Sequence, residues 1–400
     1  MSFIANVVLA PATRIVMFVL LVLLSASCGG GSNSSNPPPE PVQYVYQTPS
    51  AIGDGWQVGS LSEVGINQAM VETTINRILQ NQIKYRYIDA LLIARNGKLV
   101  FEKRFRTQFD FTDNWAGNRD VNLHVLNSVT KSYASTLVGI AIDKGYLPSV
   151  DLNVHDYYWD KQPIANWTAE KASITLDNWL TMQSGYLWDE WTIPYLDARN
   201  VHEQMINSPD PTKFLLDRPM VSVPGTTFAY STGVSYMLGD IVRRASGQSI
   251  AAFMEQNLFQ PLQIQTYDAW MTEGQIHMGA ALYLSIRDMA KLGQLFLDDG
   301  VWNGQQIVSS AWVAKATEQR VTEPNFGYGY QWWMTTFTAN GRAYQSYYAD
   351  GFGGQHIFVL PELNAVIAFN GSAYTDEQRE QRSVRQILEQ DLIPAMLAAP

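Results

Sequence analysis

The chain has 400 residues, of which 46% are hydrophobic and 16% are charged. This composition can bury a large core and excludes a mainly disordered protein. The formal net charge is −10 and the sequence has no run of lysine or arginine. Such a chain offers little to a phosphate backbone, which argues against a nucleic-acid partner. We expect a globular protein with an acidic surface.

Residues 1–28 have the pattern of an export signal. An apolar run, residues 15–24, follows Arg14, and small residues lead from it to Cys28, the only cysteine. This segment resembles a bacterial lipoprotein signal, which implies that Cys28 is lipidated and anchors the chain to a membrane. An ordinary cleaved signal peptide is the alternative, and the run is too short to favour a spanning helix. We expect an exported protein of the bacterial cell envelope, facing the periplasm or on the cell surface.

A flexible linker is expected at 29–44. Glycine and serine in this stretch give flexibility, and its prolines give extended stiffness, as a tether requires. The folded domain then covers 45–400.

Within the domain, apolar residues recur at helical spacing over 66–79. Two hairpins are predicted, one around Asn96-Gly97 and one near the C-terminal end. Helical patterns also occur between and after the hairpins. The predicted elements are a helix at 66–79, strands at 90–95 and 98–102, helices at 129–145, 174–183, 233–246 and 285–299, strands at 356–360 and 365–369, and a helix at 376–396. This order indicates an α+β fold, with an antiparallel sheet flanked by helices and an inserted helical region.

A Ser-x-x-Lys motif opens the helix predicted at 129–145. With Ser128 and Lys131 three residues apart, both side chains lie on one helix face. The N-terminus of a helix favours the negative charge that develops on a reacting oxygen, and the Ser128 N–H can donate to it. A desolvated Lys131 amine would have a lowered pKa and could accept a proton. Alone the motif is weak, because on the order of one such pair occurs by chance in a chain of this length.

A second motif strengthens this interpretation. Residues 224–233, PGTTFAYSTG, precede another predicted helix. Together with Ser128 and Lys131 they resemble the β-lactamase-like serine hydrolases, which include class C β-lactamases, DD-peptidases, carboxylesterases and 6-aminohexanoate-dimer hydrolases. The resemblance spans about residues 60–395.

The resemblance implies that Tyr230 supplies the phenol of the family's Tyr-x-Asn motif and shares protons with Lys131 and Ser128. A neighbouring cation would lower the pKa of this tyrosine, and the pair would titrate as a unit. Thr232 stands where the family has asparagine. A hydroxyl has less reach than an amide, which puts the positioning of Lys131 in question.

The family's third element is a strand that carries Lys-Thr-Gly or His-x-Gly. Here residues 349–355, ADGFGGQ, stand in its place and contain no lysine. Small residues would let this strand approach the nucleophile, so that a backbone N–H near Gly351 is a second oxyanion donor and Gly353 and Gly354 line the substrate site. In the alternative reading the glycines only ease a bend. The missing lysine argues against β-lactams as natural substrates.

Residues between these motifs supply further candidates. By resemblance to the 6-aminohexanoate-dimer hydrolases, Tyr186 donates to the leaving nitrogen. Trp188 and Trp191 either wall the pocket or pack between parts of the fold. The adjacent carboxylates Asp189 and Glu190 are expected to cap or solvate a loop.

These patterns predict a serine hydrolase that cleaves a small ester or amide through an acyl-enzyme on Ser128, with Lys131 and Tyr230 as general base and acid. No cofactor is needed, and no metal site or Gly-x-Ser-x-Gly elbow is recognisable in the sequence. The alternatives are a β-lactamase or DD-peptidase acting on cell-wall-like substrates, and a catalytically silent relative that binds peptides in the same cleft.

Overall fold

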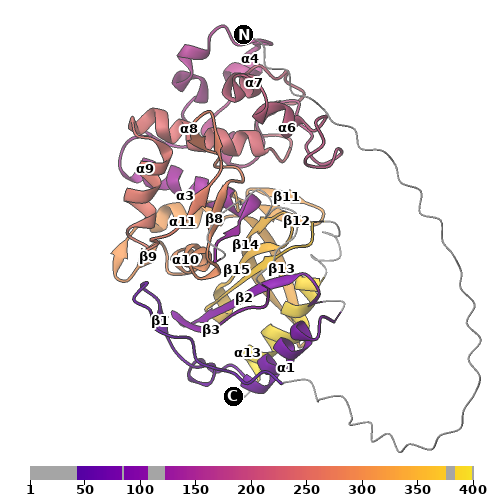
Figure 1. Cartoon of the computed structure of the whole chain (residues 1–400). Helices are drawn as coiled ribbons and strands as arrows, with labels where there is room; N and C mark the ends of the chain where they lie inside the picture. Colours follow the sequence, from indigo (N-terminus) through magenta and orange to yellow (C-terminus); the bar gives the residue numbers. More distant parts are fainter. Residues whose placement is uncertain (1–42, 83–84, 107–121, 375–382, 399–400) are drawn as a thin grey trace, which may run out of the picture. The chain divides into compact units, whose positions relative to one another are not determined.

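A computed structural model describes residues 43–82, 85–106, 122–374 and 383–398. They belong to one compact unit, Gln43–Pro400 (Figure 1). The predicted signal segment, 1–28, and most of the predicted linker lie outside the described residues, as does the start of the helix predicted at 376–396.

A nine-stranded sheet forms the centre of this unit. In spatial order its strands are β1 (Gln57–Val58), β3 (Lys98–Arg104), β2 (Ile88–Arg95), β16 (Ala365–Gly371), β15 (Gln355–Leu360), β14 (Arg342–Gly351), β13 (Trp333–Ala339), β12 (Phe326–Tyr328) and β11 (Val321–Glu323). All neighbours are antiparallel except β1 and β3, which pair in parallel at one edge. The predicted α+β fold is confirmed, with a mixed rather than a purely antiparallel sheet.

Both predicted hairpins are present. In the first, Arg95 pairs with Lys98 across Asn96 and Gly97, whose φ values of 53° and 72° are those of a tight two-residue turn. In the second, β15 and β16 meet across a short helical turn, Pro361–Leu363. The hairpins bring sequence-distant strands together, because β16 also pairs with β2.

Six helices of the described residues overlap predicted helical stretches, and five others, at 169–172, 201–206, 211–216, 250–254 and 310–316, were not predicted. Together they are α1 (Gln68–Leu79), α3 (Thr130–Asp143), α4 (Ala169–Ala172), α5 (Leu176–Leu180), α6 (Val201–Ile206), α7 (Pro211–Leu216), α8 (Thr232–Ser246), α9 (Ile250–Met254), α10 (Ile286–Leu297), α11 (Ser310–Ala316) and α13 (Ile393–Leu397). Residues 383–397 form one continuous helical stretch that includes α13.

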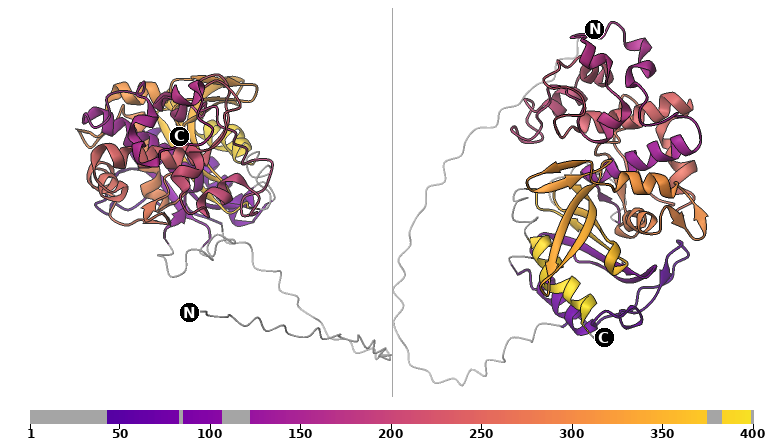
Figure 2. Two further views of the ribbon diagram at one scale, coloured as in Figure 1. Left: turned by 90° about the horizontal axis from the view of Figure 1, so that it is seen from above. Right: turned by 180° about the vertical axis from the view of Figure 1, so that it is seen from behind.

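Alternating side chains of the sheet enter two separate cores, as the two-residue period of a strand requires. On β2, Leu91 and Ile93 join the core beneath α1 and α13, whereas Leu92 and Ala94 join the larger core that contains α3, α8 and α10. Figure 2 shows these helical layers from two further sides. The sheet is therefore covered on both faces.

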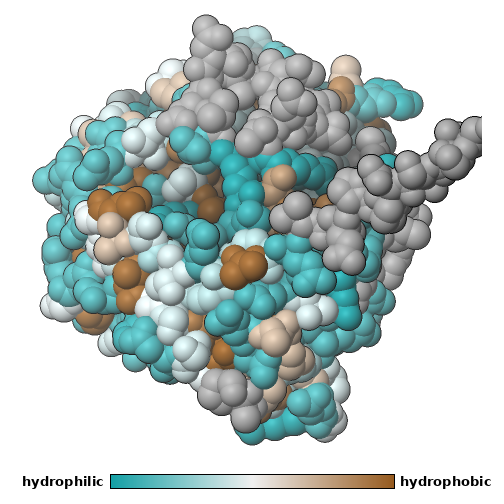
Figure 3. Space-filling model, turned by 60° about the horizontal axis from the view of Figure 1, so that its bottom comes forward, coloured by the Kyte–Doolittle hydropathy of each residue, from teal (hydrophilic) through white to brown (hydrophobic). Residues whose placement is uncertain are grey.

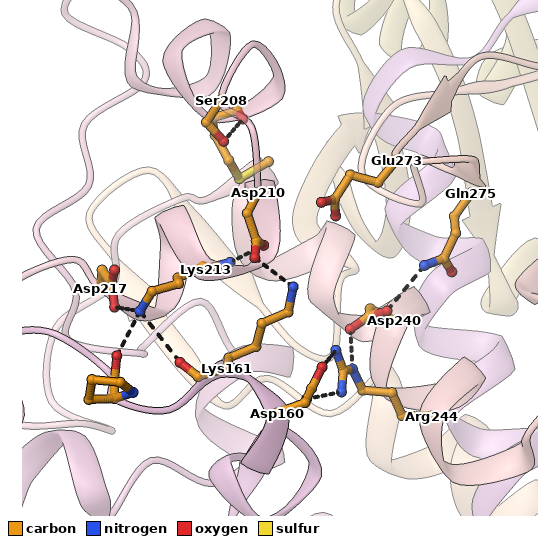
Figure 4. A network of polar contacts seen from close by, with 12 residues as sticks. Asp160, Lys161, Ser208, Asp210, Lys213, Asp217, Asp240, Arg244, Glu273 and Gln275 are labelled. Carbon is orange, nitrogen blue, oxygen red and sulfur yellow. Dashed lines mark hydrogen bonds and ion pairs between the residues drawn. The ribbon is translucent and has the colours of Figure 1, made fainter.

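Helix α8 lies between α3 and the helices α6 and α7 (Figure 1). A network of ion pairs fastens this inserted region (Figure 4). Arg244 on α8 contacts both Asp240, at 2.7 Å, and Asp160, at 2.6 Å, and Lys161 contacts Asp210 at 2.7 Å. The Arg244 pairs fix the end of α8 against the short 3-10 helix Trp159–Lys161, and the Lys161 pair fixes that helix against the start of α7.

The face drawn in Figure 3 is mainly hydrophilic, with isolated hydrophobic spots. Scattered apolar residues of this kind are normal on a soluble surface. Among the described residues, no helix is long and apolar enough to cross a membrane.

Candidate active site

Ser128 lies in a short 3-10 helix, Asn127–Val129, that runs directly into α3. Its side chain is half-buried, so a ligand can reach it. Asn127 has a left-handed φ of 46°, and its Nδ2 donates to the Phe352 carbonyl at 2.7 Å. This bond fastens the turn that carries Ser128 to the residue that follows β14.

Lys131 lies one turn further along and is buried, with 2% of its surface exposed. Its Nζ donates to Ser128 Oγ at 2.9 Å, to Thr232 Oγ1 at 3.0 Å and to the Gly279 carbonyl at 2.8 Å. Burial lowers the pKa of Lys131 to about 8, while the nearby carboxylates of Glu190 and Asp350 act in the opposite direction. The predicted contact between serine and lysine is therefore present, and the amine is partly neutral in mildly alkaline solution.

Tyr230 packs over the lysine, with Lys131 Nζ 4.8 Å from its ring centroid. The ring is stacked between Trp191, at 5.2 Å and 21°, and Trp333, at 5.6 Å and 29°. The expectation of a lowered tyrosine pKa is wrong: burial raises the pKa of Tyr230 well above its usual value, although contact with the Ser128 hydroxyl opposes the rise. Loss of solvent and, to a lesser extent, the nearby Glu190 and Asp350 carboxylates all disfavour the phenolate, so Tyr230 is a neutral phenol here.

Thr232 keeps Lys131 in place despite replacing asparagine. As the first residue of α8, it brings its hydroxyl to the Lys131 amine, and the same hydroxyl donates to Glu190 Oε1 at 2.6 Å. Gly279 makes this packing possible, because a Cβ there would lie 2.7 Å from Thr232 Cγ2.

Glu190 is a site residue that the sequence did not reveal. It is buried, at 2% exposure, and accepts from Thr232, Trp188 and Tyr195. The expectation that both neighbouring carboxylates cap or solvate a loop holds for Asp189, which accepts from the Trp191 and Thr192 amides at 3.1 Å. It is wrong for Glu190, because this carboxylate turns inward to the start of α8, where free N–H groups favour an anion.

Gly351 ends β14 beside the Ser128 turn. A Cβ at this position would lie 2.3 Å from the Leu126 carbonyl oxygen, so only glycine permits the approach that was expected. Gly353 and Gly354 form the turn between β14 and β15, with φ values of 90° and 103°. The alternative in which glycines ease a bend accounts for these two residues, and their predicted contact with substrate stays a prediction.

Tyr186 is buried and packs against residues outside the Ser128 turn. It is 1% exposed within the larger core, and its ring faces Lys171 Nζ at 5.8 Å. Its predicted role toward a leaving nitrogen stays a prediction.

The two tryptophans were expected either to wall the pocket or to pack between parts of the fold. Trp188 is buried and packs within the fold, whereas Trp191 is 57% exposed and forms an outer wall over Tyr230.

On the strand where the family has a lysine, this chain has an acidic residue, Asp350. Asp350 is partly exposed and lies 3.0 Å from His356 Nδ1 on the neighbouring strand. Arg342 does not replace the missing lysine, because it starts β14 at the opposite end and pairs with Glu362 at 2.6 Å.

Comparison with known proteins bears on the family and the fold of the chain. The model of a family described as Beta-lactamase matches residues 76–391. The 6-aminohexanoate-dimer hydrolase of Paenarthrobacter ureafaciens is 26% identical over 315 residues, which are 72% of this chain and 74% of that protein. A family VIII carboxylesterase superposes with a TM-score of 0.62 at 17% identity, covering 83% of this chain and 99% of that one. A penicillin-binding protein homologue from Caulobacter crescentus gives 0.59 at 17% identity, with coverages of 83% and 99%. Both of these solved structures resemble this chain in fold.

Proposed function

Because the chain belongs to the beta-lactamase family, we propose that it is a serine hydrolase that cleaves an ester or amide bond through an acyl-enzyme on Ser128. The observation that carries the proposal is the 2.9 Å contact between Lys131 Nζ and Ser128 Oγ. This contact joins a half-buried hydroxyl to a buried amine whose pKa is about 8. A base must lie within hydrogen-bond reach of the proton it removes, and this one does.

In the first step the Ser128 oxygen bonds to the substrate carbonyl carbon as its proton passes to the Lys131 amine. The N–H of Ser128 and a backbone N–H near Gly351 hold the oxyanion, since β14 passes directly beside the nucleophile turn. Collapse breaks the bond to the leaving group. Tyr230, a neutral phenol, donates a proton to the leaving atom and recovers it from the Lys131 ammonium. Water then attacks the acyl carbon as its proton passes to the neutral Lys131 amine. The bond from that carbon to Ser128 Oγ breaks, Ser128 takes the proton back from Lys131, and the acid is released.

We infer a preference for substrates without a negative charge near the scissile bond. Asp350 takes the place where penicillin-directed relatives carry a cationic strand, and Arg342 is engaged elsewhere. Loss of a charge-assisted hydrogen bond costs about 1.5–3 kcal/mol, a factor of roughly ten to over a hundred in transition-state binding. Neutral esters and amides fit this site better than penicillins.

The proposal is tested with a labelled fluorophosphonate on the purified domain. Wild-type protein should be labelled at Ser128, and Ser128→Ala should keep its fold while losing both label and turnover, since Ser128 is not a capping residue and alanine is well tolerated in a helix. Labelling of the alanine variant would place the nucleophile elsewhere. No labelling of either protein would favour the silent peptide-binding relative.

Substrate preference is tested on the same preparation by comparing kcat/KM for p-nitrophenyl butyrate with that for a chromogenic cephalosporin. The ester should be the better substrate, and Asp350→Asn should narrow the difference. If kcat/KM for the cephalosporin equals or exceeds that for the ester, the inferred preference is wrong and the protein recognises β-lactams as penicillin-directed relatives do.

A further inference from the structure

The Glu190 carboxylate has all its acceptor positions occupied. Oε1 accepts from Thr232 Oγ1 at 2.6 Å and from the Tyr195 hydroxyl at 2.8 Å. Oε2 accepts from the Thr232 N–H at 2.7 Å and from Trp188 Nε1 at 2.7 Å. An ionised carboxylate is a pure acceptor with about four lone-pair sites, so the ionised form satisfies every one of these donors.

This environment determines which hydrogen bonds the Thr232 hydroxyl donates and which it accepts. A hydroxyl has one proton, and the Thr232 proton is committed to Glu190, which can only accept. The 3.0 Å contact between Thr232 Oγ1 and Lys131 Nζ must then run from the amine to the hydroxyl. Thr232 accepts from the lysine and cannot donate to it.

The neutral form of Lys131 is thereby oriented. An uncharged amine keeps two N–H donors and gains one lone pair. The Gly279 carbonyl can only accept, and Thr232 is held as an acceptor, so both N–H groups are used. Of the three contacts of the amine, only Ser128 Oγ, at 2.9 Å, has a proton to give.

We propose that Glu190, acting through the Thr232 hydroxyl, is a positioning residue that directs the lone pair of neutral Lys131 at the Ser128 proton. The inference rests on the proposed function. It also explains why threonine serves here: a hydroxyl with a carboxylate behind it accepts from Lys131 as an amide oxygen would.

Several charged and titratable groups lie around the amine. Glu190 and Asp350 both act to raise the pKa of Lys131, against the effect of burial. His277, whose pKa is well below its usual value because of burial, also senses the Lys131 charge. The Tyr230 ring covers the amine. Removal of the Glu190 charge should therefore lower the pKa of Lys131 and move the acid limb of the pH–rate profile to lower pH.

The test measures kcat/KM for a neutral ester against pH for four variants. In Glu190→Gln the amide can donate to Thr232, which frees the threonine proton to compete for the Lys131 lone pair. We expect the plateau to fall about tenfold or more, part of the roughly 10²–10⁴-fold that a positioned proton-transfer group supplies. The acid limb should move to lower pH. Asp189→Asn is the matched control, since it removes the adjacent, exposed charge and keeps an acceptor for the loop amides.

A second pair keeps the test independent of whether Glu190→Gln folds. Thr232→Val removes the hydroxyl but leaves the bonds from Trp188 and Tyr195 to the carboxylate intact. It should show the same fall in the plateau of kcat/KM. Thr232→Ser restores the hydroxyl and should recover most of the rate.

Two results would overturn the inference: a fallen plateau with an unmoved acid limb in Glu190→Gln, which marks a merely structural role, or wild-type kinetics in Thr232→Val. These failures differ from failure of the proposed function. In that case Ser128→Ala would still react with the fluorophosphonate, or wild-type protein would not react at all.

Discussion

At the scale of single residues, Lys131 sets the expected pH dependence. In the proposed mechanism the neutral amine is the active form. Its pKa is about 8, so kcat/KM should rise with pH through about 8 and level off above it. A profile measured on a neutral ester from about pH 6 to about pH 10 checks this. An acid limb near the usual lysine pKa would show that burial does not depress the group.

Lys131→Arg supplies the matched variant. Guanidinium keeps the positive charge but stays protonated at every accessible pH, so it cannot act as a base. We expect kcat/KM to fall by roughly 10²–10⁴-fold, the contribution of a general base. Near wild-type rates would mean that the amine serves only as a charge.

Gly351 gives a second residue-scale prediction. In Gly351→Ala the new Cβ would meet the Leu126 carbonyl at 2.3 Å, which forces β14 away from the Ser128 turn. We expect a stability loss of about 1–3 kcal/mol and, because the proposed oxyanion donor moves, a fall in kcat of about 10²–10³-fold.

Gly341→Ala is the control on the same hairpin. Its φ of 75° strains a side chain, but nothing lies within 4 Å, so stability should fall by about 1 kcal/mol without a change in kcat. Unchanged kcat in Gly351→Ala would show that β14 supplies no hydrogen-bond donor to the oxyanion.

The sequence revealed some of these residues and hid others for a physical reason. Ser128 and Lys131 are three apart on one helix, so local geometry alone joins them. Glu190 reaches the same amine only through a fold that lays its loop against the start of α8. Side by side in the sequence, Asp189 and Glu190 carry the same charge, and nothing local distinguishes the exposed carboxylate from the buried one.

At the scale of elements, short-range signals predicted both hairpins correctly, whereas strands β11, β12 and β13 were not predicted. The Asn96-Gly97 turn pairs Arg95 with Lys98 and so sets the register of β2 and β3 next to the turn, up to a bulge between Ile93 and Ala94. The parallel pairing of β1 with β3 was missed, since two residues carry no periodicity. The ion pairs of the inserted region were equally hidden, because they join residues far apart in the chain.

Arg244 tests the importance of that network for α8. Its guanidinium bonds Asp240, Asp160 and the Tyr157 carbonyl while covering the Tyr158 ring at 4.5 Å. A lysine cannot reproduce this fork. Arg244→Lys should lower stability by about 1.5–3 kcal/mol, seen as a lower denaturant midpoint, with kcat unchanged.

Arg199→Lys is the control for Arg244→Lys, because the Arg199 side chain is 76% exposed in its pair with Asp197. Such a surface pair should change stability by no more than about 0.5 kcal/mol. Equal effects of the two variants would show that the α8 network contributes no more than a surface bridge.

At the scale of the whole molecule, the sequence predicted the α+β architecture because predicted strands lie near both ends of the domain and segments with helical periodicity lie between them. That order requires the terminal hairpins to pair, as β16 and β2 do. Substrate preference could not be predicted to the same depth. It depends on where Asp350, Trp191 and Arg342 lie relative to Ser128, and no spacing in the sequence states this.

The last prediction concerns location and rests on residues outside the described part of the chain. We propose that Cys28 is lipidated, because an apolar run and small residues precede it and a Gly/Ser/Pro-rich tether follows. Each buried CH₂ of an acyl chain contributes about 0.8 kcal/mol of membrane affinity, so multiple chains would hold the domain firmly at a surface. In a bacterial host, wild-type protein should sediment with membranes and incorporate labelled palmitate, whereas Cys28→Ser should do neither. Processed Cys28→Ser protein that still sediments with membranes would show that the anchor lies elsewhere.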